Sequence, residues 1–142
     1  SASVQEAAKS AHYIHGGGEM AEFSEQFTGV NILLVDPHEG LTDILARGLR
    51  KTGAAVAVAT TPEEGLNHLR QHPCSVCVVS HEPPALGAVE FMEAASVLSE
   101  ARYVIVSSGD ISLATRIPVS GILLPPFQLE TLLAIIKRAV SQ

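Results

Sequence analysis

The sequence predicts a doubly wound α/β domain with a five-stranded parallel sheet, and three observations support this fold class. From residue 31 onward, short apolar runs alternate with amphipathic segments. The runs are continuously apolar, as expected for parallel strands that are buried on both faces. The segments between them carry apolar residues at spacings of three and four, which is typical of helices that cover a sheet. With 142 residues, the chain is long enough for one such domain.

The first strand is expected at Ile32 to Val35, and the helix after it carries Leu41, Ile44, Leu45 and Leu49 on one stripe. Thr61 before Pro62 supplies a cap and a first helical position for the second helix, which we expect to run through Gln71. The remaining strands are expected at 54–59, 74–80, 103–107 and 121–124.

Two further helices complete the expected layers. Helix 88–98 should turn Val89, Met92 and Ala95 inward. The last helix should dock on the sheet through one stripe made of Leu129, Leu132, Leu133, Ile136 and Val140. The interval between Ser108 and Pro125 leaves room for about two helical turns at most. We therefore expect a shortened fourth helix there, capped by Asp110.

Composition excludes several function classes. The net charge is −6 and only nine Lys and Arg are present, so we expect no nucleic-acid partner. No apolar run approaches the roughly 20 residues that span a bilayer, and no signal peptide is evident, so we expect no membrane association and a cytoplasmic location. Residues 1–28 differ in composition and are interpreted as a linker, the end of an upstream domain or a cloning remnant.

Cys74 and Cys77 form a C-x-x-C pair, which raises the alternatives of redox chemistry and of half a zinc site. Both cysteines fall in the expected third strand, where a separation of three places side chains on opposite faces. No second pair completes a four-cysteine zinc site. We therefore expect neither a metal nor a redox function.

The order and spacing of five segments resemble the response-regulator receiver family, whose fold is flavodoxin-like or CheY-like. Asp36 looks like the acidic end of the family's first strand, and Ser80 stands at the phosphoacceptor position. Ser108 stands at the Thr/Ser switch position. Pro125, before Pro126 and Phe127, looks like the Lys-Pro-Phe signature of the fifth strand. The resemblance covers roughly residues 30–142.

The departures from the family pattern concern its chemistry. The resemblance implies two acidic residues after the first strand and an aspartate after the third, which hold magnesium and accept the phosphoryl group. Here Pro37 occupies the second acidic position, Ser80 replaces the aspartate and Pro125 replaces the lysine. Ile122 stands where the family has a rotating aromatic residue. Residues 29–142 are therefore interpreted as a pseudo-receiver domain with no catalytic residue, no metal and no cofactor.

The leading functional hypothesis is a phosphorylation-independent signalling module of a two-component-type system. It would bind a protein partner, such as a histidine kinase, or an adjacent domain of its parent protein, and a homodimer is a further expectation. Its expected interaction surface comprises Asp110, Ile111, Leu113, Arg116, Ile117 and Ile122, with an ordered loop over this flank as the competing interpretation. The alternative function is a nucleotide or second-messenger site, such as one for a cyclic dinucleotide, with Ser107, Ser108 or Arg116 contacting phosphate.

Overall fold

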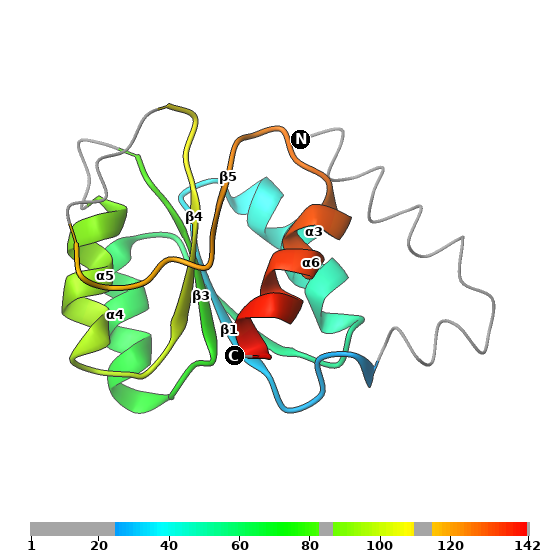
Figure 1. Cartoon of the computed structure of the whole chain (residues 1–142), viewed down its shortest axis with the longest axis horizontal. Coiled ribbons are helices and arrows are strands. Elements are labelled where there is room, and N and C mark those ends of the chain that lie inside the picture. Colours follow the sequence, from blue (N-terminus) through cyan, green and yellow to red (C-terminus); the bar gives the residue numbers. More distant parts are fainter. Residues whose placement is uncertain (1–24, 83–86, 110–114, 142) are drawn as a thin grey trace.

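A computed structural model describes residues 25–82, 87–109 and 115–141 and confirms the doubly wound α/β class. Five parallel strands form one sheet in the order β2-β1-β3-β4-β5. The strands are β1 (Asn31–Val35), β2 (Ala55–Ala59), β3 (Val76–Ser80), β4 (Arg102–Val106) and β5 (Gly121–Leu123). The helices are α3 (Glu39–Arg50), α4 (Pro62–Gln71), α5 (Ala88–Ser96) and α6 (Leu129–Val140). Helices α4 and α5 cover one face of the sheet, and α3 and α6 cover the other (Figure 1).

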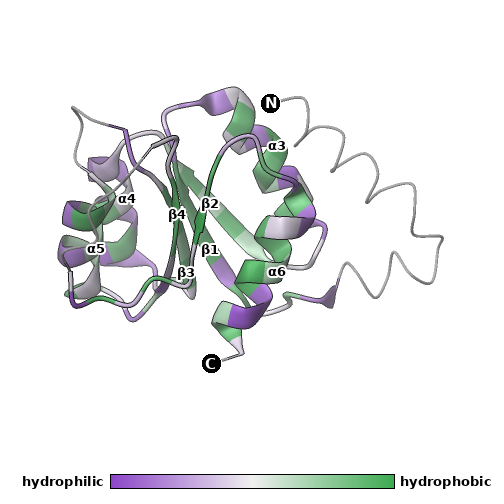
Figure 2. Cartoon of the chain, turned by 45° about the horizontal axis from the view of Figure 1, so that its top comes forward, coloured by the Kyte–Doolittle hydropathy of each residue, from purple (hydrophilic) through white to green (hydrophobic). Residues whose placement is uncertain are grey.

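Each face of the sheet has its own apolar core, because successive residues of a buried strand point to opposite sides. In β1, Ile32 and Leu34 pack with α3 and α6, whereas Leu33 and Val35 pack with α4 and α5. Figure 2 shows hydrophobic strands between helices whose colour alternates around their circumference. The continuous apolar runs therefore correspond to strands that are covered by helices on both faces of the sheet, as the sequence predicts.

Local sequence signals explain where helix α4 begins and how closely helices α3 and α6 pack against each other. The Thr61 side chain accepts a hydrogen bond of 3.1 Å from the backbone N–H of Glu64, so Thr61 caps α4 as predicted. At Gly48 of α3, an added Cβ would lie 2.6 Å from a methyl carbon of Leu129 in α6. Gly48 thus permits the close approach of the two helices on this face.

Two predicted helix stripes need correction. Val140 is 36% exposed, and α6 instead buries Ile135 and Ala139 beside the predicted leucines. The stripe is wider than predicted because this helix lies against both the sheet and α3. In α5, Phe91 is fully buried and Val89 only partly. The buried face of α5 is therefore centred on Phe91, Met92 and Ala95, and Val89 lies at its margin.

The connection between β4 and β5 contains no helix in its described part, residues 107–109 and 115–120. The predicted short fourth helix and its cap, Asp110, fall on 110–114 and lie outside the described residues. Ile117 and Val119 pack against the core on the α4 and α5 side. This half of the connection therefore covers the flank of the sheet as a loop, which favours the competing interpretation for Ile117.

The prediction that Cys74 and Cys77 lie on opposite faces is wrong. Both thiols are buried in the same core, with α4 and α5. The period-two rule fails because Cys74 precedes β3 and is not part of the strand. Burial raises the pKa of both thiols, which keeps them protonated and therefore poorly nucleophilic. Near them lies the Tyr103 hydroxyl, which is buried and has no hydrogen-bond partner among the described residues.

The packed domain begins before residue 29. Phe27 is 1% exposed in the core with α3 and α6, and its N–H donates to the Thr52 carbonyl over 2.7 Å. The sequence places Phe27 in the preceding segment because a single aromatic residue creates no periodic pattern. Among the described residues, no helix is long and apolar enough to cross a membrane.

Phe127 directly precedes α6 and is 7% exposed in the core with α3 and α6. Replacing it with alanine leaves a cavity, so we expect Phe127→Ala to lower the free energy of unfolding by about 3 to 5 kcal/mol. Leu124 lies three residues earlier and is 65% exposed, so Leu124→Ala is the matched control. Urea denaturation measures both variants. Equal stability of the two variants would contradict the assignment of Phe127 to the core.

Candidate functional site

The predicted site residues of β1 and β3 meet at the carboxyl edge of the sheet. The two strands are adjacent and parallel, with Val35 paired to Val79. The next residues along each strand are Asp36 and Ser80, so this register sets them side by side. Functional side chains in such sheets gather at this edge.

Asp36 is 7% exposed and is held by hydrogen bonds from its neighbours. Its Oδ1 accepts from the backbone N–H of His38 over 2.7 Å. Burial raises the pKa of Asp36 above its ordinary value, and the His38 N–H and the nearby Ser80 hydroxyl only partly offset that effect. The carboxylate is therefore costly to keep charged, and it already has internal partners.

A second pair, which the sequence analysis did not identify, lies beside the first. His38 Nε2 and Glu82 Oε1 are 2.6 Å apart and join the loop after β1 to the loop after β3. The hydrogen bond and the charge of Glu82 raise the pKa of His38. A signal was present in the sequence, because His38 and Glu82 each stand two residues beyond the paired positions Asp36 and Ser80.

His81 has a structural role at the start of α5. Its Nδ1 accepts from the Ala88 N–H over 3.0 Å, and its own backbone N–H donates to the Val106 carbonyl over 2.8 Å. His81 is half-buried. Its Nδ1 is occupied by a backbone amide, so this nitrogen is not available to take a proton from the Ser80 hydroxyl as a catalytic base would.

The ends of β4 and β5 bring hydroxyl and ring groups to this edge. Ser108, at the predicted switch position, is exposed, whereas Ser107 is 4% exposed. The Ser107 hydroxyl donates to the Gly109 carbonyl over 2.9 Å, so it satisfies a backbone group of its own loop. Pro37 and Pro125 are both exposed, and the peptide bond from Pro125 to Pro126 is cis.

The chemistry available at this edge is limited by its charges. Magnesium prefers several oxygen ligands, usually including more than one carboxylate. Asp36 is the carboxylate at the end of β1, and Glu82 is directed to His38. Within the described ranges, no group of three His, Cys, Asp or Glu side chains could hold a metal ion.

The predicted interaction surface is described only in part, since Asp110, Ile111 and Leu113 lie outside the described residues. Arg116 is exposed, and Ile117 lines a shallow hollow with Glu93 of α5. Ile122 of the edge strand β5 is 41% exposed. The structure therefore places Ile117 and Ile122 on the flank of the sheet beyond β4, where they differ in burial.

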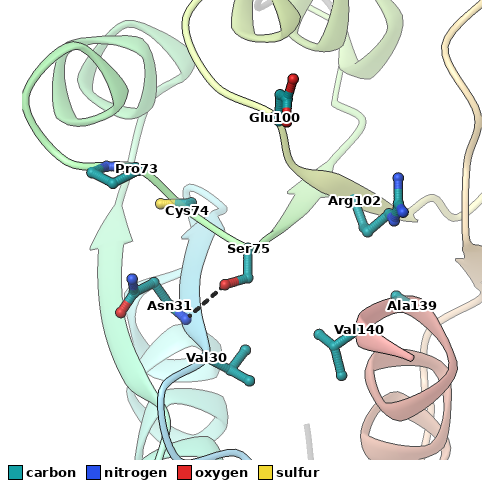
Figure 3. Close-up of a pocket in the computed structure, with 9 residues that line it drawn as sticks. All are labelled: Val30, Asn31, Pro73, Cys74, Ser75, Glu100, Arg102, Ala139 and Val140. Atoms are coloured by element: carbon teal, nitrogen blue, oxygen red, sulfur yellow. Dashed lines mark hydrogen bonds between the residues drawn. The ribbon is translucent and has the colours of Figure 1, made fainter. Parts of the chain in front are cut away.

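A separate hollow of about 460 Å³ lies at the opposite, amino-terminal edge of the sheet (Figure 3). Asn31 and Ser75 face each other in it, and the Asn31 N–H donates to the Ser75 hydroxyl over 3.1 Å. Glu100 and Arg102 lie on its far side. None of the residues predicted for function from the sequence lines this hollow.

The strand order, the helices on both faces and the acidic end of β1 define a doubly wound domain of the receiver type. No family model matches the sequence, and no curated protein matches it significantly. The fold is nevertheless that of the response-regulator receiver domains, as the solved structures show.

Three solved structures illustrate the likeness. A CheY-like receiver domain protein from Methanospirillum hungatei JF-1 has a TM-score of 0.72 at 20% identity, over 79% of this chain and 94% of that chain. The N-terminal domain of a response regulator/sensory box/GGDEF 3-domain protein from Carboxydothermus hydrogenoformans has a TM-score of 0.70 at 18% identity, over 78% and 94%. A response regulator from Burkholderia pseudomallei, with a phosphorylated aspartic acid and a calcium ion, has a TM-score of 0.69 at 22% identity, over 79% and 69%.

The contact between His38 and Glu82 predicts a specific titration. Because Glu82 stabilises the protonated imidazole, Glu82→Gln should lower the pKa of His38, which NMR of the ring protons measures directly. In the wild type, the contact stabilises the fold below the ordinary pKa of histidine, and this contribution is lost as pH rises through the raised value. The pair is exposed, so the loss should not exceed about 1 kcal/mol.

Glu130→Gln is the matched control for this titration, since Glu130 is exposed at the start of α6. It should leave the His38 titration unchanged. If Glu82→Gln also leaves the His38 titration unchanged, the two loops are not joined in solution.

Proposed function

We propose that this chain is a phosphorylation-independent receiver-like signalling module of a two-component-type system. In this proposal it acts through contact with a protein partner or with an adjacent domain of its parent protein. The observation that carries the proposal is the pairing of β1 with β3, which sets Ser80 beside the buried Asp36. A neutral residue thus occupies the phosphoacceptor position beside the remaining carboxylate.

The charge balance of the site supports the loss of phosphorylation. A transferable phosphoryl group needs a carboxylate to accept it and cations to offset its charge. The positions that would provide them hold Ser80, Pro37 and Pro125, which are all neutral. Asp36 is buried and its Oδ1 already accepts from the His38 N–H, and a single carboxylate is a poor divalent-cation site.

The loops around the site support a pre-formed surface in place of a switched one. The loop after β1 is joined to the loop after β3 through His38 and Glu82, and His81 holds the first turn of α5. The Ser107 hydroxyl is bonded to its own loop. Each of these groups has a partner without any phosphoryl group, so the domain can present one conformation constitutively.

The exposed apolar side chains of Ile122 in β5 and of Leu124 directly after it support a contact site on that flank. Ile122 is 41% exposed and Leu124 is 65% exposed, and they stand two residues apart on the edge of the sheet. Exposed apolar side chains that lie together often mark a protein contact. The similar N-terminal domain comes from a 3-domain protein of Carboxydothermus, which supports an adjacent domain as the partner. If the contact is with a separate protein, a histidine kinase is the expected partner.

One contact in the structure opposes the alternative of a nucleotide or second-messenger site. The Ser107 hydroxyl, one of its three suggested phosphate contacts, is already bonded to the Gly109 backbone.

Incubation with acetyl phosphate and magnesium should leave the intact mass of the protein unchanged, because Ser80 is neither a carboxylate nor a strong magnesium ligand. The matched variant combines Pro37→Asp, Ser80→Asp and Pro125→Lys, which restores the three charged groups of the family pattern. This variant should gain the mass of one phosphoryl group. The same gain on Ser80 of the wild type would refute phosphorylation independence.

Ile122→Glu should abolish partner binding without unfolding the domain, because the side chain is already in contact with water. Pairwise binding assays against full-length histidine kinases and against the adjacent domain of the parent protein measure the effect. Val97→Glu, at an 83% exposed position after α5, is the control and should bind normally. If a partner binds Ile122→Glu as well as the wild type, the contact site lies elsewhere.

A further inference from the structure

The edge strand β2 lacks the features that usually keep an edge from pairing with another chain. It is the outermost strand beside β1, and its sequence, residues 55–59, reads AVAVA. Sheet edges are commonly protected by charged residues, proline or a bulge, and this strand contains none of them. Figure 2 colours it as hydrophobic, and Val58 is 39% exposed.

The hydrogen bonds of β2 define which of its backbone groups face outward. The Ala55 N–H donates to Val30, and the Ala59 carbonyl accepts from the Asp36 N–H, so alanines 55, 57 and 59 are paired to β1. The N–H and C=O groups of the alternate residues, Val56 and Val58, therefore point away from the sheet. The Val56 carbonyl accepts a 2.9 Å hydrogen bond from the Arg50 guanidinium, which reaches it from the end of α3.

We propose that β2 is a homodimer interface, where a second copy of this chain adds its own β2 in antiparallel orientation. This inference goes beyond the proposed function and uses the opposite edge of the sheet. The sequence AVAVA is the same in both directions, so an antiparallel copy centred on Ala57 places Val56 opposite Val58 and alanine opposite alanine. A twofold dimer requires such self-complementarity. The outward groups of Val56 then bond to those of Val58 of the other copy.

The charges on α3 favour this partner. Asp43, Arg47 and Arg50 are spaced four and three residues apart, so they form one exposed stripe, and the Arg50 contact places this stripe beside the edge. In the antiparallel dimer, the two α3 helices run in opposite directions. Asp43, at the beginning of one stripe, then faces Arg50, at the end of the other copy's stripe. The two copies are therefore complementary in charge along this edge.

Arg50 changes partners in this arrangement. In the monomer its guanidinium occupies the Val56 carbonyl, which leaves that acceptor satisfied. In the dimer the Val58 N–H of the other copy replaces it, and Arg50 turns to the facing Asp43. Val58, exposed in the monomer, becomes covered beside Val56 of the other copy.

Cysteine cross-linking tests the register directly. At the twofold axis, Ala57 forms a non-hydrogen-bonded pair with its own copy, where Cα atoms are about 4.5 Å apart and a disulfide can form. The matched position Ala55 would stand about 14 Å from its copy, since the two are four residues apart along the strands at roughly 3.4 Å per residue. With oxidised glutathione as the oxidant, full-length Ala57→Cys should become a covalent dimer, whereas Ala55→Cys and the wild type, whose cysteines are buried, should not.

Sedimentation of the full chain over a concentration series gives an independent test in case Ala57→Cys folds poorly. The wild type should associate to twice its 14.9 kDa mass. Val58→Lys, which places a cation beside Arg50 of the other copy, should raise the dimer dissociation constant by about tenfold or more, whereas Val58→Glu should raise it less. Ile122→Lys, on the opposite edge, should leave it unchanged.

The outcomes separate this inference from the proposed function. Cross-linking at Ala57 alone, with loss of the dimer in Val58→Lys, supports the β2 interface whatever Ile122 binds. A wild type that stays monomeric, equal cross-linking at Ala55 and Ala57, or dissociation by Ile122→Lys but not by Val58→Lys would each overturn it. A monomeric wild type that binds an extended peptide along β2 would assign the edge to that partner instead.

Discussion

The parallel register between β1 and β3 is the constraint on which the site depends. Pairing of Val35 with Val79 sets Asp36 beside Ser80, and His38 and Glu82, two residues further along each chain segment, meet in the loops that follow. Two apolar cores, one on each face, fix this register, because a shift of one residue would turn every buried side chain to the wrong side. The geometry of the carboxyl edge is thus determined by packing and would persist without a ligand.

The carboxyl edge of this sheet carries little charge, although it corresponds to the edge where receiver domains hold a metal and a phosphoryl group. Asp36 is desolvated and hydrogen-bonded internally, and the pKa shift toward neutrality shows that the site does not compensate its charge fully. Glu82 is committed to His38 across the two loops. At the same edge, the Ser107 hydroxyl and the His38 N–H already have partners within the chain.

The sequence predicts the sheet and its order of elements because these follow from periodic apolar patterns and from start signals such as Thr61 before Pro62. It also brings Asp36 and Ser80 to one edge. It fails where a residue lies outside a periodic element, as with Phe27 and Cys74. The contact between His38 and Glu82 depends on loop conformation and on the β1 to β3 register, and an unaligned sequence does not reveal either of them directly.

We infer that the described carboxyl edge of the sheet keeps one conformation with or without a phosphoryl mimic. Two-dimensional amide NMR of the wild type, recorded with and without beryllofluoride and magnesium, tests it most directly. The account predicts that the amide resonances of Ser107, Gly109 and Leu123 stay in place, since the Ser107 hydroxyl and its loop already have their partners. Saturable shifts of these resonances would contradict it, because they would show that the edge still binds the mimic and transmits the binding to β5.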